Sequence, residues 1–250
     1  MRRIIAVLTL FLGLIAVAWA ADRRVDLELV LLADASRSID DVEIRLQRQG
    51  YAAAITHPQV LKAITGGYRQ RIAVTYVEWG DETSQEVVVP WQIVDGPASA
   101  AKFAAKLMAR PRLAHGPNAI GNAIVAAHAL IEANDIAGDR RVIDFSGDSA
   151  WSWGGVPIEQ ARAMAIADDI VINGLAILCR DCSGRPVSYD LEAAYAELII
   201  GGPGAFVVTA DGDDRFAEAV RRKLVLEIAG GQPGPARTVV NADIARQTIR

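Results

Sequence analysis

Three oxygen-bearing side chains follow a nearly continuous apolar stretch. Residues 27–33 are mostly aliphatic, and Asp34, Ser36 and Ser38 come directly after them at alternate positions. This pattern predicts a strand that is buried on both faces and delivers its polar end to the edge of a sheet. Carboxylate and hydroxyl oxygens, with no Cys or His among them, suit a hard divalent cation. The first motif therefore indicates a site for such a cation.

Two later loops add oxygen ligands. Asn118 lies in a Gly-Pro-Asn turn between two predicted helices, and Asp148 follows a strand predicted at 141–146. Ligands in open α/β sheets bind at the carboxyl ends of the strands, so we expect Asp148 at the same edge as Asp34, with the Asn118 turn above it. With Ser36 and Ser38 they fill about five of the six octahedral positions that Mg²⁺ prefers, once waters bridge the carboxylates.

Helical and strand periodicities alternate along the rest of the chain. They predict strands at 27–33, 72–79, 86–94, 141–146, 170–178 and 205–209, and helices at 40–57, 100–108, 120–131, 157–165, 191–199 and 216–228. Ser38 is the expected N-cap of the first helix. The six-residue connection before 86–94 is too short for a crossover helix and predicts a hairpin, and Pro90 places that strand at an edge. The fold class is α/β: a three-layer α/β/α sandwich around a mostly parallel six-stranded sheet with one antiparallel edge strand.

The N-terminus has the pattern of a signal peptide. Arg2 and Arg3 precede the apolar residues 4–17, and Ala18-Trp19-Ala20 is a small-x-small cleavage site. An uncleaved anchor is the alternative, because 17 residues lie at the lower limit of a membrane span. We expect a signal peptide at 1–20, one domain at 21–230 and a flexible tail at 231–250, in a periplasmic or secreted protein without a membrane span after cleavage.

Charge and cysteine content limit the partners and the redox chemistry. Without Arg2 and Arg3, 24 of the 26 basic residues remain against 30 acidic ones, a net charge of about −6 that argues against nucleic acid as the main partner. In an oxidising compartment Cys179 and Cys182 are expected to form a short-loop disulfide. A redox-active pair remains the alternative.

Several other side chains have two possible roles. Arg37, Trp151 and Trp153 flank the predicted cation site and are candidates for contacting a partner, or are surface and loop-packing residues. His115 either lines the site or belongs to a surface turn. His128 and Asp144 are expected in the interior. His128 lies on the apolar face of its helix, and Asp144 should pair with a basic group such as Arg141 or face a polar gap.

Taken together, these features resemble the von Willebrand factor A domain and its metal-ion-dependent adhesion site. The Asp-x-Ser-x-Ser motif after a strand, the order of elements and the later loops carry the resemblance, which covers about 26–230. The sequence is most similar to a group of exported bacterial proteins without assigned activity. The stretches that suggest this group are 46–51, 77–79, 142–148 and 200–206.

The resemblance implies metal ligands, and the family pattern differs here at two points. It implies that Ser36 and Ser38 bind the cation directly, and that Asp34 and Asp148 bind directly or through water. Asn118 stands where the family usually has Thr, and Ser-Gly-Asp-Ser around Asp148 stands where it usually has Thr-Asp-Gly. A carbonyl oxygen of Asn118 can still serve as a neutral ligand.

The leading hypothesis is an exported, non-enzymatic binding module. A protein partner would supply an Asp or Glu carboxylate to a bound Mg²⁺, or to Mn²⁺ or Ca²⁺. Catalysis is not implied, because the site pairs no nucleophile with a base. Two alternatives stay open: a metal-dependent hydrolase, which would need a second metal or a general base, and a scaffold whose metal site is degenerate.

Overall fold

A six-stranded sheet forms the centre of the computed structural model, which describes residues 23–178, 189–211 and 213–230. The strand order is β4-β3-β2-β6-β7-β8, and every neighbouring pair is parallel except β3 and β4. The strands are β2 (Leu27–Asp34), β3 (Ile72–Trp79), β4 (Gln85–Val94), β6 (Arg141–Gly147), β7 (Ile170–Leu178) and β8 (Val207–Asp211). The predicted fold class, including the hairpin and its antiparallel edge strand, is confirmed. A separate two-stranded parallel sheet joins β1 (Arg24–Val25) to β5 (Ala137–Gly138).

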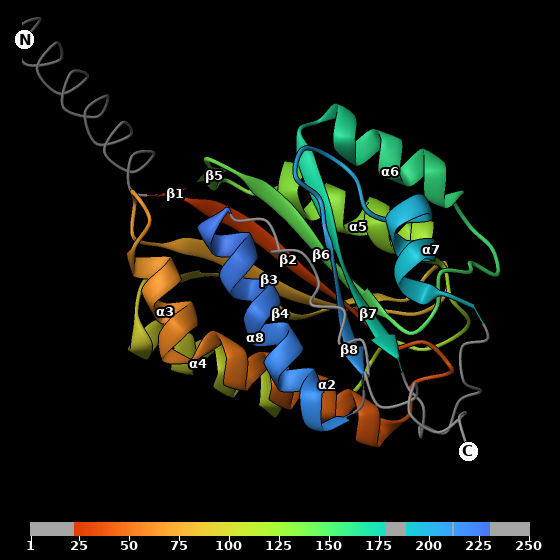
Figure 1. Ribbon diagram of the computed structural model, residues 1–250, viewed down its shortest axis with the longest axis horizontal. Helices are drawn as coiled ribbons and strands as arrows, with labels where there is room; N and C mark the ends of the chain where they lie inside the picture. The colour runs from red at the N-terminus through yellow and green to blue at the C-terminus, as the bar shows by residue number, and fades with distance from the viewer. Residues whose placement is uncertain (1–22, 179–188, 212, 231–250) are drawn as a thin grey trace, which may run out of the picture.

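Helices cover both faces of the sheet (Figure 1). One layer holds four helices: α2 (Asp41–Ile55), α3 (Pro58–Thr65), α4 (Pro97–Ala109) and α8 (Asp213–Ala229). The other layer holds α5 (Ile120–Glu132), α6 (Ile158–Ala167) and α7 (Leu191–Leu198). Parallel neighbouring strands are joined by right-handed crossover connections, and these place helices on both faces of the sheet. No described helix is long and apolar enough to cross a membrane.

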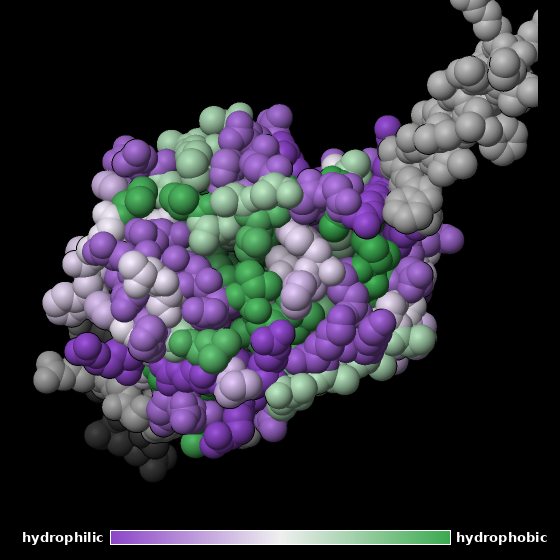
Figure 2. Space-filling model, turned by 180° about the vertical axis from the view of Figure 1, so that it is seen from behind, coloured by the Kyte–Doolittle hydropathy of each residue, from purple (hydrophilic) through white to green (hydrophobic). Residues whose placement is uncertain are grey.

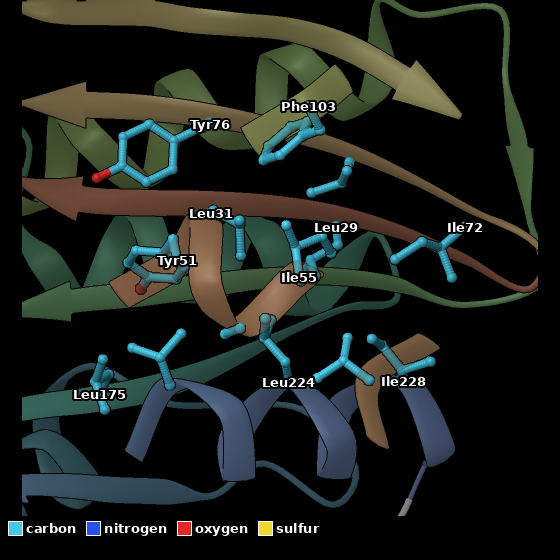
Figure 3. Packing of buried hydrophobic residues seen from close by; sticks show 14 of the residues in the cluster. Leu29, Leu31, Tyr51, Ile55, Ile72, Tyr76, Phe103, Leu175, Leu224 and Ile228 are labelled. Carbon is cyan, nitrogen blue, oxygen red and sulfur yellow. The ribbon is translucent and has the colours of Figure 1, made fainter. Parts of the chain in front are cut away.

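The core consists of two apolar layers separated by the sheet. Alternate side chains of β2 point to opposite faces, so Leu29 and Leu31 belong to one layer, and Val30 and Leu32 to the other. Figure 3 shows Leu29 and Leu31 beside Tyr51 of α2 and facing Leu224 of α8. Burial of β2 on both faces explains its nearly continuous apolar sequence.

The edge strand β4 is only half-buried. From behind, apolar residues gather in the middle of the face where β4 lies (Figure 2). Val87, Trp91 and Ile93 are partly exposed there. Pro90 lies within this strand, where a missing backbone donor is tolerated because one side has no neighbour.

The start and end of the first predicted helix differ from the expectation. Asp40, not Ser38, is the N-cap of α2: its Oδ1 accepts hydrogen bonds from the backbone N–H groups of Val42 and Glu43 at 2.7 and 2.9 Å. The helix ends at Ile55, and a separate helix, α3, begins at Pro58. Proline is favoured in the first turn of a helix and restricts the residue before it, which separates the two helices.

Two interior predictions have different outcomes. Asp144 does not pair with Arg141: Lys223 Nζ lies 2.6 Å from its Oδ1, and Arg141 pairs with Glu132. Residues three apart on a strand point to opposite faces, so Arg141 could not share the buried face of Asp144. His128 is partly buried, and its Nε2 lies 2.7 Å from Asp168 Oδ2.

Three further predictions lie outside the described residues. These are the signal peptide at 1–20, the Cys179–Cys182 disulfide and the tail at 231–250.

The strand predicted at 205–209 is present as β8, two residues further along the chain.

Candidate metal centre

The turn after β2 gathers three of the predicted ligands. The backbone N–H of Ser36 donates to Asp34 Oδ1 at 2.8 Å, and the Oγ atoms of Ser36 and Ser38 lie 3.3 Å apart. Asp34 and Ser36 have no exposed surface. Because the strand buries the carboxylate and the turn folds back over it, the two hydroxyls lie beside it in one small volume.

Asp148 reaches this turn from the neighbouring strand. β6 pairs with β2 in parallel, so their carboxyl ends lie side by side, and Ser38 Oγ is 3.3 Å from Asp148 Oδ1. Gly147 permits the close approach: a Cβ there would lie 2.9 Å from Asp34 Oδ2. The sheet register thus unites Asp34, Ser36, Ser38 and Asp148, as the sequence predicts.

The two carboxyl groups have an unfavourable electrostatic environment. Burial raises the pKa of Asp34 to about 8, and the nearby Asp148 carboxylate contributes to the increase. Burial also raises the pKa of Asp148. The Oδ2 atom of Asp34 is buried and accepts no hydrogen bond from the described residues. A cation between these groups would offset the repulsion between the two carboxylates and would give the Asp34 Oδ2 atom a partner.

Asn118 lies in a loop that contacts the other two loops. The Arg37 N–H donates to Gly116 O at 2.8 Å, and the Trp153 N–H donates to Asn118 O at 2.8 Å. Asn118 is only 7% exposed. None of the hydrogen bonds in the described region joins its side chain to the other four predicted ligands. The backbone therefore places Asn118 at the site, while its amide is not engaged by them.

The predicted partner-contact residues surround this cluster at the surface. Arg37 is exposed, and Trp151 and Trp153 are 65% and 82% exposed. The Trp151 ring packs edge-on against Tyr189, with the ring centroids 6.3 Å apart. His115 bonds through Nδ1 to Ser84 Oγ at 3.0 Å and lines a surface cavity together with Arg37.

Three residues that hold the loops in place were missed from the sequence. Arg112 donates to the carbonyl oxygens of four residues in two loops, Ala35, Ser36, Ile39 and Ala114, at 2.6 to 3.0 Å. Gln47 Nε2 donates to Asp34 O at 3.1 Å, and Tyr195 OH to Gly147 O at 2.8 Å. Gln47 had a detectable signal, a polar residue within an apolar helical pattern. Arg112 and Tyr195 had none, because their partners lie far along the chain.

The donor set fits a hard cation better than a soft one. Two carboxylates and two hydroxyls converge, and oxygen ligands of this kind suit Mg²⁺, Mn²⁺ or Ca²⁺. In the described part of the chain, no group of three or more His, Cys, Asp or Glu side chains could hold a metal ion. A cation at this site would therefore depend on neutral oxygens as well as on the carboxylates.

Solved structures share this architecture at low sequence identity. The pilus adhesin SpaC of Lactobacillus rhamnosus GG has a TM-score of 0.57 at 12% identity, covering 82% of this chain and 31% of SpaC. The von Willebrand factor domain of the pilus tip protein Mfa5 from Porphyromonas gingivalis has a TM-score of 0.53 at 10% identity, covering 84% of this chain and 97% of that domain. The fold is therefore von Willebrand factor A-like.

A third similar structure contains a metal-site motif of this kind. Proximal thread matrix protein 1 from the mussel byssus, in a form with zinc in its metal-ion-dependent adhesion site, has a TM-score of 0.55 at 14% identity. The match covers 82% of this chain and 46% of that protein, so the chain spans about a third of SpaC and about half of the byssus protein. Residues 24–232 match the model of a family described as "Protein of unknown function (DUF1194)". A search of curated proteins found no match.

Proposed function

The chain belongs to this family of unknown function, and we propose that it is an exported binding module that recognises a protein partner through a divalent cation. Asp34, Ser36, Ser38 and Asp148 would hold Mg²⁺, Mn²⁺ or Ca²⁺, and Asn118 would complete the set from the adjoining loop. When bound, the cation would offer an open position to an Asp or Glu carboxylate of the partner.

One observation carries the proposal: Asp34 and Asp148 lie together beside Ser36 and Ser38, no described basic side chain forms an ion pair with either carboxylate, and the buried Oδ2 of Asp34 accepts no hydrogen bond from a described residue. Leaving a buried carboxylate oxygen unpaired is costly, and such positions in folded proteins are normally satisfied. A cation is the group that satisfies both carboxylates at once.

The chain's own residues would prepare the site in two ways. Arg112 and Gln47 fix the backbone of the first loop through its carbonyl oxygens, so the two serine hydroxyls are oriented before binding. Arg37 is exposed beside the site and would attract an acidic partner, while the exposed Trp151 and Trp153 would contribute apolar contact area.

The structural neighbours support an adhesion or scaffold function. SpaC is a pilus adhesin, Mfa5 is a pilus tip protein, and the byssus protein is a matrix protein with zinc at its metal site. These names support binding rather than turnover. Their sequence identities support the fold, while the metal, the partner and a non-enzymatic function are proposals for this chain.

Export is part of the same proposal. Residues 1–20 would be removed as a signal peptide, leaving one domain at 21–230 and a tail at 231–250 in the periplasm or outside the cell. Cys179 and Cys182 would then form a disulfide in an oxidising compartment.

Chemical unfolding in the presence of each cation tests the metal site. Saturation to about a hundred times the dissociation constant should raise the unfolding free energy by about 2.7 kcal/mol relative to chelator. Asp148→Asn should lose most of this increase, whereas Asp169→Asn, an exposed aspartate outside the site, should retain it. Equal curves with cation and with chelator for the unaltered protein would contradict the metal site and favour the degenerate scaffold.

A further inference from the structure

A second pocket lies beside the proposed metal centre. It has a volume of about 320 Å³, and its walls include Asp81, Glu82, Asn118 and Trp153. Asn118 belongs to both places, because it lines this pocket and is also the proposed neutral ligand of the cation. A partner seated on the cation would therefore also cover the pocket.

The two acidic residues come from the β3–β4 connection. Asp81 Oδ1 accepts hydrogen bonds from the Thr83 N–H at 3.0 Å and the Thr83 hydroxyl at 3.1 Å. These bonds, the backbone one above all, hold the pKa of Asp81 below its ordinary value, which keeps the group ionised. Glu82 is exposed, and its carboxylate forms no hydrogen bond or ion pair with a described residue. Two negative charges are thus available at one wall.

Trp153 is the aromatic residue of the pocket, and its backbone is held in place. The Trp153 N–H donates to Asn118 O at 2.8 Å, and Ser152 Oγ bonds to the same oxygen at 3.3 Å. The indole nevertheless remains 82% exposed. Gly154 follows, and a Cβ there would collide with the Glu82 carboxylate, so the acidic and aromatic walls lie close together.

Asn118 supplies a side-chain amide that has no hydrogen-bond partner among the described residues. Asn118 is only 7% exposed and lines the pocket, yet its side-chain amide forms no hydrogen bond with a described residue. Its amide atoms are not fully enclosed, so a ligand in the pocket can reach them. Its carbonyl oxygen is an acceptor, as are the two carboxylates.

We propose that this pocket binds a Lys or Arg side chain of the partner. The carboxylates, the indole and the amide oxygen of this pocket match an ammonium or guanidinium group, which is attracted by negative charge and by aromatic faces. An anion would be repelled by Asp81 and Glu82. Arg is the better fit, because its planar group can stack on the indole while donating several hydrogen bonds.

This inference deepens the proposed function and rests on it for the identity of the partner. The proposed metal centre would take an acidic side chain, and the adjoining pocket would take a basic one. The partner is then expected to present an acidic and a basic residue close together at its contact surface. Two weak contacts made by one ligand reinforce each other through a high effective concentration.

A peptide titration in chelator tests the pocket without the cation. The probe is acetyl-Gly-Arg-Gly-amide, and its neutral isostere contains citrulline in place of Arg. We expect the Arg peptide to bind at millimolar concentrations, followed by the backbone N–H signals of Asn118 and Gly154 in NMR spectra, and the citrulline peptide to bind at least fivefold more weakly. Glu82→Gln should weaken the Arg peptide at least fivefold and Trp153→Phe at least threefold.

Matched variants control for charge and for aromatic content. Glu218→Gln removes a carboxylate from α8 in the other helix layer, and Trp151→Phe alters the other exposed indole, which does not line the pocket. Both should change the affinity for the Arg peptide less than twofold. Equal binding of the Arg and citrulline peptides, or equal losses in the control variants, would overturn the proposal. Displacement of the Arg peptide by an equal concentration of Ca²⁺ would assign the pocket to an inorganic cation and overturn it too.

A second series separates this pocket from the metal centre. With Mg²⁺ present, a peptide that carries both Asp and Arg should bind at least tenfold more tightly than peptides that carry either residue alone. Metal-dependent binding of the Asp peptide without any gain from Arg would overturn the pocket and leave the proposed function intact. Binding of the Arg peptide together with no metal-dependent binding of the Asp peptide would do the reverse.

Discussion

The described residues include two pairs of neighbouring carboxyl groups that are neutralised differently. Asp34, Asp144 and Glu227 are buried, and Asp148 is partly exposed. In the interior, Lys223 Nζ lies 2.6 Å from Asp144 Oδ1 and 2.6 Å from Glu227 Oε1, and Asn173 donates to the same Glu227 oxygen at 3.0 Å. At the edge of the sheet, Asp34 and Asp148 have two serine hydroxyls beside them and form no ion pair with a described basic residue. Each pair also has a carboxylate oxygen, Asp34 Oδ2 or Glu227 Oε2, that lacks a hydrogen-bond partner among the described residues. The interior pair has its own cation, and the edge pair has only oxygens.

This difference separates a structural cluster from a binding site. β6 contributes to both pairs, since Asp144 lies within the strand and Asp148 just after it. The interior cluster joins β6 to α8 and is closed to solvent, so its charges serve the fold. The edge pair lies where loops can admit a ligand, which is why a cation from solution is the expected partner there. Even the interior cluster is one positive charge short, and burial together with Asp144 raises the pKa of Glu227 to about 8.

Removal of the interior cation should produce the largest effect. Lys223→Met leaves Asp144 and Glu227 buried without a positive charge, so the unfolding free energy should fall by about 3–5 kcal/mol. Denaturant unfolding measures this loss. Lys106→Met, an exposed lysine on α4, is the control and should change stability by less than about 0.5 kcal/mol. A loss below about 1 kcal/mol in Lys223→Met would mean that the interior pair does not depend on its lysine.

Because the interior cluster has two carboxyl groups and one lysine, the unfolding free energy should depend on pH. The folded state holds a proton on Glu227 that the unfolded chain, with a pKa near 4.5, releases earlier. The stabilisation is therefore fully present below about pH 4.5 and is lost as the pH rises towards 8, by about 3 kcal/mol between pH 5 and pH 8.

Glu227→Gln isolates this contribution, because Gln keeps an acceptor for Asn173 but cannot ionise. Its unfolding free energy should vary with pH by about 3 kcal/mol less than that of the unaltered protein. Glu218→Gln on the surface of the same helix should keep the original dependence. Parallel pH curves for the unaltered protein and Glu227→Gln would show that Glu227 does not carry the proton.

The sequence predicted the positions of the proposed ligands better than it predicted the neighbours of buried charged groups. Asp34 and Asp148 were placed together because the carboxyl ends of parallel strands share one edge, a rule that requires only the order of elements. The hairpin followed from a connection too short for a crossover. Lys223, by contrast, reaches Asp144 from the last helix, and no local pattern links the two, so the nearby Arg141 was the expected partner.

Loop contacts were equally hidden from local patterns. Arg112 holds the first loop through three carbonyl oxygens, but carbonyl groups are present at every position and give a sequence no signal. The separate helix α3 was missed for a different reason: it begins at Pro58, directly after the first predicted helix, and has only eight residues. Long-range side-chain contacts and helix ends therefore required the structure.

The smallest of the three effects is that of Asp34→Asn on stability, and its sign should differ between chelator and saturating Mg²⁺. In chelator at pH 7, Asp34→Asn removes a carboxyl group that must take up a proton to be buried beside Asp148, and it should raise the unfolding free energy by about 1–2 kcal/mol. Its Oδ1 can still accept the hydrogen bond from Ser36. With saturating Mg²⁺ the order should invert, because the unaltered protein gains about 2.7 kcal/mol and the variant gains little. Lys223→Met should keep its deficit in both conditions, since its effect lies in the interior. If Asp34→Asn were destabilising by the same amount with and without cation, the edge pair would be a structural cluster like the interior one, and the distinction between the two regions would fail.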